Sequence, residues 1–321
     1  MGRAASVRGM GAFVNPLRSL ILAAAGNDVI RRAVATAPVS RDVVRRFVAG
    51  ETTAEAIGVT RRLVDAGLTV TLDYLGEDTT DEALAEQTVR AYEELLDALH
   101  ADGLATRAEV SVKLSAVGQL LDEDLALRNA GRIATAAERV GTTVTLDMED
   151  HTTTDSTLRV LAGLRGTWPW VGAVLQSYLR RTEEDCARLA GAGSRVRLCK
   201  GAYAEPPEVA FTGALDVDRS YVRCVNALLV GDGYPMFATH DPRLVPIIDA
   251  RAEFHGRKPG SFEYQMLFGI RPEEQRRLAA LGHTVRVYVP YGVQWYGYLM
   301  RRLAERPANT AFFLRALASR T

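Results

Sequence analysis

The feature that most constrains the fold of this chain is a repeated alternation of short β-rich runs with longer helical stretches. Eight such runs follow one another between residues 68 and 289, and a segment of helical periodicity comes after each. The runs span residues 68–73, 109–115, 143–147, 171–176, 195–200, 236–240, 262–267 and 284–289. Eight strand–helix units in a segment of this length are typical of a (β/α)8 barrel. The sequence therefore predicts an α/β fold of the TIM-barrel type.

A doubly wound sheet is the competing architecture, and the glycine pattern argues against it. Such a sheet normally carries a glycine-rich turn after its first strand, whereas the run 68–73 continues into the residues YLGE at 74–77. The glycines of GAG at 191–193 precede a strand and are typical of a helix end. A phosphate-loop lysine pattern is also missing from the sequence. We therefore favour the barrel.

Helices are expected ahead of the barrel. Residues 16–66 have helical patterning: the segment RDVVRRFVAG ends at Gly50, and the residues from Thr52 to Glu55 form a capping pattern that begins a second helix. The arginine-bearing start of the chain fits either a transit-like segment or the first helix of the fold, and we favour the helix. The sequence thus predicts an N-terminal helical segment, 1–66, that packs on a catalytic barrel, 67–321.

The charge balance and the cysteine and histidine patterns exclude several classes of protein. Lysine plus arginine total 39 residues and so do aspartate plus glutamate, so no basic surface for nucleic acid is expected. Three cysteines and five histidines lack metal-ligand spacing, so we expect no metal site, and the odd cysteine count indicates a reducing, cytoplasmic location. No apolar run approaches the ~20 residues that would span a bilayer.

Polar residues end the predicted strands, which is where TIM-type barrels place their active sites. The strand-end residues are Asp73, Lys113, Asp147, Gln176, Arg197 with Lys200, Thr239 with His240, Gln265 and Tyr288. Each also has an ordinary structural interpretation. Asp147 could cap the next helix, His240 could be structural, and Gly201 after Lys200 could serve either a turn or the close approach of a phosphate. Their joint placement predicts a polar, cation-rich rim.

Two adjacent arginines, Arg301 and Arg302, lie in the amphipathic segment YGYLMRRLAERPAN, one turn after Tyr298. Neighbouring guanidiniums repel unless an anion lies between them, and their forked donors match a carboxylate or phosphate two bonds at a time. The other arginine pairs of the chain, such as Arg276-Arg277, are expected to be solvated helix faces. The pair 301–302 therefore predicts a clamp for a small acid.

Taken together, these segments resemble the proline dehydrogenase family, flavin-dependent enzymes that oxidise L-proline to Δ1-pyrroline-5-carboxylate. The matching segments are VSVKLSA (110–116), VTLDMED (144–150), VLQSYLRR (174–181), VRLCKGAY (196–203), FATHD (237–241), FEYQMLFGI (262–270), VRVYVPYG (285–292) and YLMRRLAE (298–305). DYLGE (73–77) and the region 13–66 are similar to the short, single-activity bacterial branch.

The resemblance implies a role for each matching site residue. The proline carboxylate would be held by Lys113, Arg301 and Arg302. The ring pocket would be walled by Tyr203, Leu267, Tyr288 and Tyr298. Asp147 would belong to the catalytic group, and Arg197 would lie near N5 of the flavin. FAD would be contacted by Met148, Gln176, Arg197, Lys200, Gly201, Ala202, Thr239 and His240. Because such enzymes bind FAD without a dinucleotide-binding domain, the missing glycine fingerprint agrees with the resemblance.

The resemblance also implies partners and leaves alternatives open. Electrons would pass to a quinone, which would place the protein at the inner face of a membrane, and a separate pyrroline-5-carboxylate dehydrogenase would take the product. Cys199, Asp241 and the Arg306-Pro307 pair depart from the family pattern and put cofactor affinity and a helix end in question. A preference for hydroxyproline or an N-alkyl amino acid, a methylenetetrahydrofolate reductase, and a barrel without flavin remain the alternatives. The general base for the amine is not identified by the sequence.

Overall fold

The computed structural model describes residues 44–76 and 79–305, with side chains described up to residue 300. The chain divides into two compact units. One unit is continuous, from Arg46 to Val293, and contains all of the strands. The described part of the other unit includes the helix α12, Trp295–Glu305.

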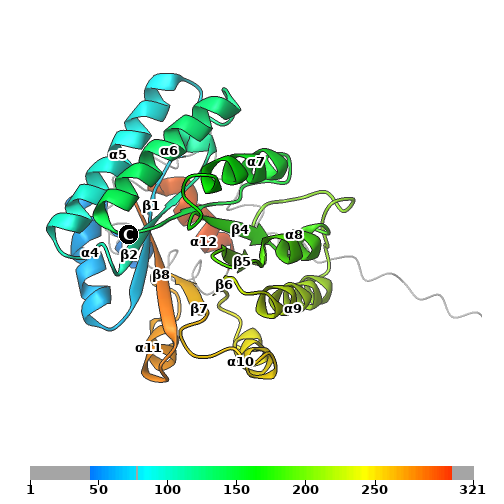
Figure 1. Cartoon of the computed structure of the whole chain (residues 1–321). Coiled ribbons are helices and arrows are strands. Elements are labelled where there is room, and N and C mark those ends of the chain that lie inside the picture. Colours follow the sequence, from blue (N-terminus) through cyan, green and yellow to red (C-terminus); the bar gives the residue numbers. More distant parts are fainter. Residues whose placement is uncertain (1–43, 77–78, 306–321) are drawn as a thin grey trace, which may run out of the picture. The chain divides into compact units, whose positions relative to one another are not determined.

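Eight parallel strands close into a barrel in the order β1 to β8, with β8 pairing back onto β1 (Figure 1). The strands are β1 Thr69–Tyr74, β2 Ala108–Val112, β3 Val144–Leu146, β4 Gly172–Gln176, β5 Arg195–Cys199, β6 Tyr234–Ala238, β7 Glu263–Leu267 and β8 Thr284–Tyr291. The predicted (β/α)8 architecture is confirmed, and every predicted run contains or overlaps one of these strands.

A helix follows each of the first seven strands and packs outside the barrel, as Figure 1 shows. These helices are α5 Glu82–Ala101, α6 Glu123–Val140, α7 Thr154–Arg165, α8 Thr182–Leu189, α9 Ala214–Val230, α10 Leu244–Phe254 and α11 Pro272–Ala280. A short 3-10 turn, η1 Ser115–Val117, lies between β2 and α6.

The helix α4, Thr53–Asp65, precedes the first strand and has the cap that the sequence predicts. The Thr52 side chain accepts a hydrogen bond from the Glu55 backbone, and the Glu55 side chain accepts one from the backbone of Thr52. This reciprocal pair satisfies two backbone donors that the first helical turn leaves free. The helices predicted upstream lie largely outside the described residues, so the domain boundary at residue 66 stays a prediction.

Side chains along the strands alternate between the barrel interior and the helices outside. In β1, Val70 and Leu72 are buried in the hydrophobic core, whereas the Thr71 hydroxyl donates at 2.8 Å to Glu109 on β2. Neighbouring strands repeat this alternation. The apolar layer between strands and helices therefore holds the fold together, while polar side chains fill the interior and lead to the strand ends.

Candidate active site

Two oppositely charged side chains meet at the carboxyl ends of β1 and β2. The ammonium of Lys113, which directly follows β2, donates to both oxygens of Asp73 at 2.7 Å. Burial raises the pKa of Asp73, and it outweighs the opposing effect of the Lys113 charge. The sequence marks Asp73 only as a strand-end residue, and the structure identifies it as the carboxylate that holds Lys113.

Asp147 directly follows β3 and accepts hydrogen bonds from two other strands. Its Oδ1 accepts from Arg197 Nη1 at 2.8 Å, and its Oδ2 accepts from the Tyr288 hydroxyl at 2.7 Å. The Arg197 guanidinium also lies 5.3 Å from the centre of the Tyr288 ring. Burial, with the Asp147 charge, raises the pKa of Tyr288 well above its usual value, so the phenol remains a donor. Asp147, Arg197 and Tyr288 thus form one connected group.

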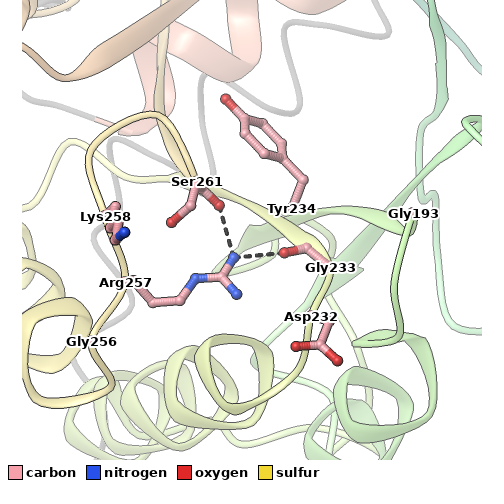
Figure 2. A pocket seen from close by; sticks show the side chains of 8 residues that line it. All are labelled: Gly193, Asp232, Gly233, Tyr234, Gly256, Arg257, Lys258 and Ser261. Atoms are coloured by element: carbon pink, nitrogen blue, oxygen red, sulfur yellow. Dashed lines mark hydrogen bonds between the residues drawn. The ribbon is translucent and has the colours of Figure 1, made fainter.

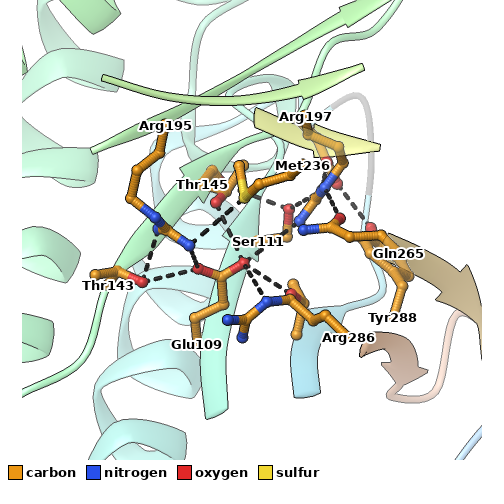
Figure 3. Close-up of polar contacts among 12 residues, drawn as sticks. Glu109, Ser111, Thr143, Thr145, Arg195, Arg197, Met236, Gln265, Arg286 and Tyr288 are labelled. Carbon is orange, nitrogen blue, oxygen red and sulfur yellow. Dashed lines mark hydrogen bonds and ion pairs between the residues drawn. The ribbon is translucent and has the colours of Figure 1, made fainter. Parts of the chain in front are cut away.

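A second charged layer lies deeper in the barrel, centred on Glu109 (Figure 3). Carboxylate oxygens of Glu109 lie 2.7 Å from Arg195, 3.6 Å from Arg197 and 3.7 Å from Arg286. Burial raises the pKa of Glu109, but the three guanidiniums outweigh it and hold the pKa well below its usual range. Arg286 also pairs with Glu263 at 2.7 Å. Glu109 is therefore an anion that holds three strands of the barrel together.

Among the described residues, the charges inside the barrel balance, and the strand-end pattern in the sequence singles out only half of these residues. The cationic members are Arg195, Arg197, Arg286 and Lys113, and the anionic members are Asp73, Glu109, Asp147 and Glu263. A signal was available: charged and polar residues recur at every second position of the strands, as in T-V-T-L-D at 69–73, E-V-S-V-K at 109–113 and R-V-R at 195–197. This period of two places them all on the interior face.

Polar contacts also occupy the ends of β4 and β5. Gln176 donates through Nε2 to the Glu149 carbonyl at 2.5 Å. The Lys200 ammonium lies 2.6 Å from Asp218 and 3.0 Å from Asp241, and Arg243 donates to the same two carboxylates. Hydrogen bonds from Arg243, with those from Lys200, hold the pKa of Asp241 well below its usual range. Lys200 therefore lies directly after the end of β5, with two carboxylates around it.

The loop after β5 explains why residue 201 is a glycine. Gly201 has φ of +113°, and a Cβ at this position would lie 2.4 Å from the Tyr178 ring. Ala202 is exposed, and Tyr203 is half-buried. The Tyr178 hydroxyl donates to Glu205, whose carboxylate also contacts His151 in the loop after β3. The loops after β3 and β5 are thus tied together through Glu205.

The residues predicted at the ends of β6 and β7 lie next to each other. The Leu267 backbone donates to Nε2 of His240 at 2.9 Å, and Thr239 accepts from the Asp241 backbone at 3.1 Å. Because Nε2 of His240 accepts, His240 connects two strand ends through its unprotonated nitrogen. Met148 is buried beside Asp147 in the sequence. Tyr298 and the arginines at 301–302 lie on α12, in the other compact unit, so the barrel alone does not assemble the whole predicted set.

A cavity of about 420 Å³, whose lining residues are drawn in Figure 2, lies at the end of the barrel opposite to the carboxyl ends of the strands. It is lined by Gly193, Asp232, Gly233, Tyr234, Gly256, Arg257, Lys258 and Ser261, which lie before or at the starts of β5, β6 and β7. Residues at this end of a TIM-type barrel contribute to stability, whereas catalytic residues lie at the carboxyl ends of the strands. We therefore place the candidate active site at the charged strand ends.

Within the described residues, no three histidine, cysteine, aspartate or glutamate side chains group as metal ligands. Among the same residues, no helix is both long enough and apolar enough to cross a membrane.

Comparisons with known proteins agree with the resemblance in the sequence. Residues 56–315 match the family described as "Proline dehydrogenase". The chain is 43% identical over 282 residues to a proline dehydrogenase of Deinococcus radiodurans, covering 86% of this chain and 90% of the relative. It is 38% identical over 273 residues to proline dehydrogenase 1 of Bacillus subtilis, covering 85% and 90% of the two chains.

A solved structure has the same fold. It is proline utilization A from Bdellovibrio bacteriovorus inactivated by N-propargylglycine, with a TM-score of 0.76 and 26% identity. The similarity covers 87% of this chain and 34% of that larger protein. Together with the family match over most of the chain, these relatives establish that the chain is an enzyme of the proline dehydrogenase family.

Proposed function

We propose that this enzyme oxidises L-proline to Δ1-pyrroline-5-carboxylate with FAD as its cofactor. The observation that carries the proposal is the connected charged group at the strand ends: Asp147 bonded to Arg197 and Tyr288, beside the pair of Asp73 and Lys113. In the proline dehydrogenase family, such a group can orient a small acid against a flavin.

The substrate would be held by its carboxylate and enclosed by apolar walls. Lys113, Arg301 and Arg302 are the cations that we assign to the carboxylate. Tyr203, Leu267, Tyr288 and Tyr298 are assigned to the ring pocket. Because both Asp147 oxygens already accept hydrogen bonds, we assign Asp147 the role of orienting Arg197 and Tyr288 rather than that of general base. The two guanidiniums of Arg301 and Arg302 on the substrate would favour the neutral amine, which is the form that can be oxidised.

We assign the residues at the rim to a flavin nucleotide. The contacts assigned to FAD are Met148, Gln176, Arg197, Lys200, Gly201, Ala202, Thr239 and His240. Arg197 supports this assignment because Asp147 holds its guanidinium at the strand ends through Nη1, whereas its Nη2 faces Glu109 in the barrel interior. Bound FAD would supply the electron-accepting chemistry, taking a hydride from C5 of the proline ring at N5. Arg197 would place its charge where negative charge develops on reduction.

The remaining partners follow from the same proposal. The two electrons would pass to a quinone-type acceptor, with the protein in the cytoplasm or held at the inner face of the membrane. The product would pass to a separate pyrroline-5-carboxylate dehydrogenase. In contrast, the Escherichia coli relative named bifunctional protein PutA is matched by this chain over only 25% of its length.

The visible spectrum of the purified protein tests the proposal directly. We expect flavin absorption bands that bleach when L-proline is added without oxygen, and that do not bleach with NADH. Hydroxyproline, added to the same preparation, is expected to bleach the bands more slowly. A protein that stays colourless after incubation with FAD would contradict the proposal. A yellow protein whose flavin bands do not respond to proline would show that its substrate is a different compound.

Replacing Asp241 by asparagine is expected to tighten FAD binding, by roughly three- to tenfold. Lys200 and Arg243 are now balanced by Asp218 and Asp241, and an anionic diphosphate near Lys200 is repelled by these carboxylates. Fluorescence titration of the flavin-free protein measures the dissociation constant. Asp216→Asn is the matched control because Asp216 is exposed and faces Arg219. Weaker binding by Asp241→Asn would mean that Asp241 positions Lys200 instead of competing for it.

A further inference from the structure

Three acceptors orient the Arg197 guanidinium, and one of them is the side-chain amide of Gln265. Its Nε donates to Oε1 of Gln265 at 2.5 Å (Figure 3), and its Nη1 donates to Asp147 at 2.8 Å. Nη1 also donates to the Ser111 hydroxyl at 3.0 Å. The planar guanidinium has donors fixed in one plane, so an acceptor at Nε and two at Nη1 set its direction.

The orientation of the Gln265 amide is itself dictated by a carboxylate. Nε2 of Gln265 donates at 2.6 Å to Oε1 of Glu263, which also accepts from Arg286 Nε at 2.7 Å. A carboxylate can only accept, so the amide nitrogen must face Glu263 and the amide oxygen must face Arg197. Arg286, Glu263, Gln265 and Arg197 thus form a chain of hydrogen bonds. The direction of each bond in this chain depends on the charge of Glu263.

Burial keeps this chain of contacts from being replaced by water. Glu263 is 1% exposed, Gln265 is 3% exposed and Arg197 is 4% exposed. In such surroundings, an unmatched donor or acceptor is costly, and the network has one low-energy arrangement.

We propose that Gln265 is a positioning residue for the oxidation, and that Glu263 and Arg286 act with it to aim Arg197 at the reacting atoms. The inference rests on the proposed function, because it assigns Arg197 to the flavin. Glu263, Gln265 and Arg286 act only through Arg197, from the interior of the barrel. The sequence would allow Gln265 a direct role at the strand end, whereas the geometry gives it an indirect one.

A charge-conserving exchange of the two residues tests the proposal. Glu263→Gln alone removes the charge that fixes the amide, and Gln265→Glu alone brings two carboxylates together. Each is expected to lower kcat by roughly ten- to hundredfold with a smaller change in KM, because Arg197 is misaligned. In the double variant, the glutamate at position 265 accepts from Arg197 and the glutamine at position 263 donates to that glutamate. Its kcat is therefore expected to return to within about threefold of wild type. A double variant no better than the worse single variant overturns the proposal.

The midpoint potential of the bound flavin is a second measurement, and a general loss of protein stability would not change it. We expect a more negative potential in Gln265→Met, which removes the acceptor without adding a charge, and an unchanged potential in Tyr234→Phe. Tyr234 donates to the other oxygen of Glu263 at 3.2 Å and so is a matched control. If Glu263→Gln does not fold, the Gln265→Met variant tests the proposal alone. An unchanged flavin potential and an unchanged kcat in Gln265→Met would overturn the proposal. Wild-type protein without flavin would instead contradict the proposed function.

Discussion

Replacing Glu109 by glutamine is expected to lower the free energy of unfolding by about 3–5 kcal/mol, because three buried guanidiniums lose the anion that they share. Glu109 is 1% exposed, so water cannot take over this role. Urea denaturation of the flavin-free protein at pH 7 measures the change. Glu123→Gln is the control: Glu123 pairs with Arg159 on the surface, and its loss is expected to cost less than about 1 kcal/mol. Equal effects of the two substitutions would contradict the central role of Glu109.

The same glutamate predicts how stability depends on pH. The folded pKa of Glu109 lies below its ordinary value of 4.5, so the charged form contributes stability at pH values above 4.5. That contribution is lost as the pH falls below 4.5 toward the folded pKa. The difference in unfolding free energy between wild type and Glu109→Gln is therefore expected to shrink in acid. A difference that stays constant from pH 7 to pH 3 would contradict the assignment.

Arg301→Lys and Arg302→Lys are each expected to raise the KM for proline by roughly a hundredfold or more while FAD stays bound, because one guanidinium fork on the carboxylate is lost. Steady-state kinetics and the flavin spectrum of the same samples measure the two quantities. Loss of flavin in these variants would mean that the clamp is wrongly assigned to the substrate.

A second arginine pair of the chain provides the control for the clamp. Arg276 and Arg277 lie on α11, and both side chains are more than half exposed, in contact with Glu273 and Glu274. Arg276→Lys and Arg277→Lys are expected to leave KM and kcat unchanged. An equal rise in KM there would show that the effect is not specific to the pair 301–302.

The barrel could be predicted because each strand and helix has a local pattern of its own. The positions at which strands end were predicted less accurately, as the sixth strand illustrates. The sequence extends it to His240, whereas β6 ends at Ala238. Thr239 and His240 are compatible with a strand, but their side chains form hydrogen bonds to the backbones of Asp241 and Leu267, which hold the loop. Such side-chain contacts depend on the neighbouring strand and are not visible in the local sequence pattern.

The candidate site could be predicted as a set of strand-end residues, whereas the pairs that these residues form could not. Asp73 pairs with Ser111 in the register of β1 and β2, and Lys113 lies two residues farther along. That register brings the Lys113 ammonium to Asp73. Asp147 in turn is bonded to Arg197, 50 positions away in the sequence. The choice of partner depends on how the strands align around the closed barrel, which periodicity alone does not specify.

The charged interior has a consequence for engineering this enzyme. Exchanging buried ion pairs for apolar side chains of similar volume is a common route to higher thermostability, and the layer around Glu109 and Arg286 is an obvious target for such repacking. Arg197 lies 3.6 Å from Glu109 and is bonded to Gln265, which in turn is bonded to Glu263 of this layer. An aliphatic replacement of the layer would therefore remove part of the support of Arg197. Thermostabilising substitutions are better chosen on the outer helices, such as the exposed ends of α9 and α10, where a change in packing does not reach the reacting atoms.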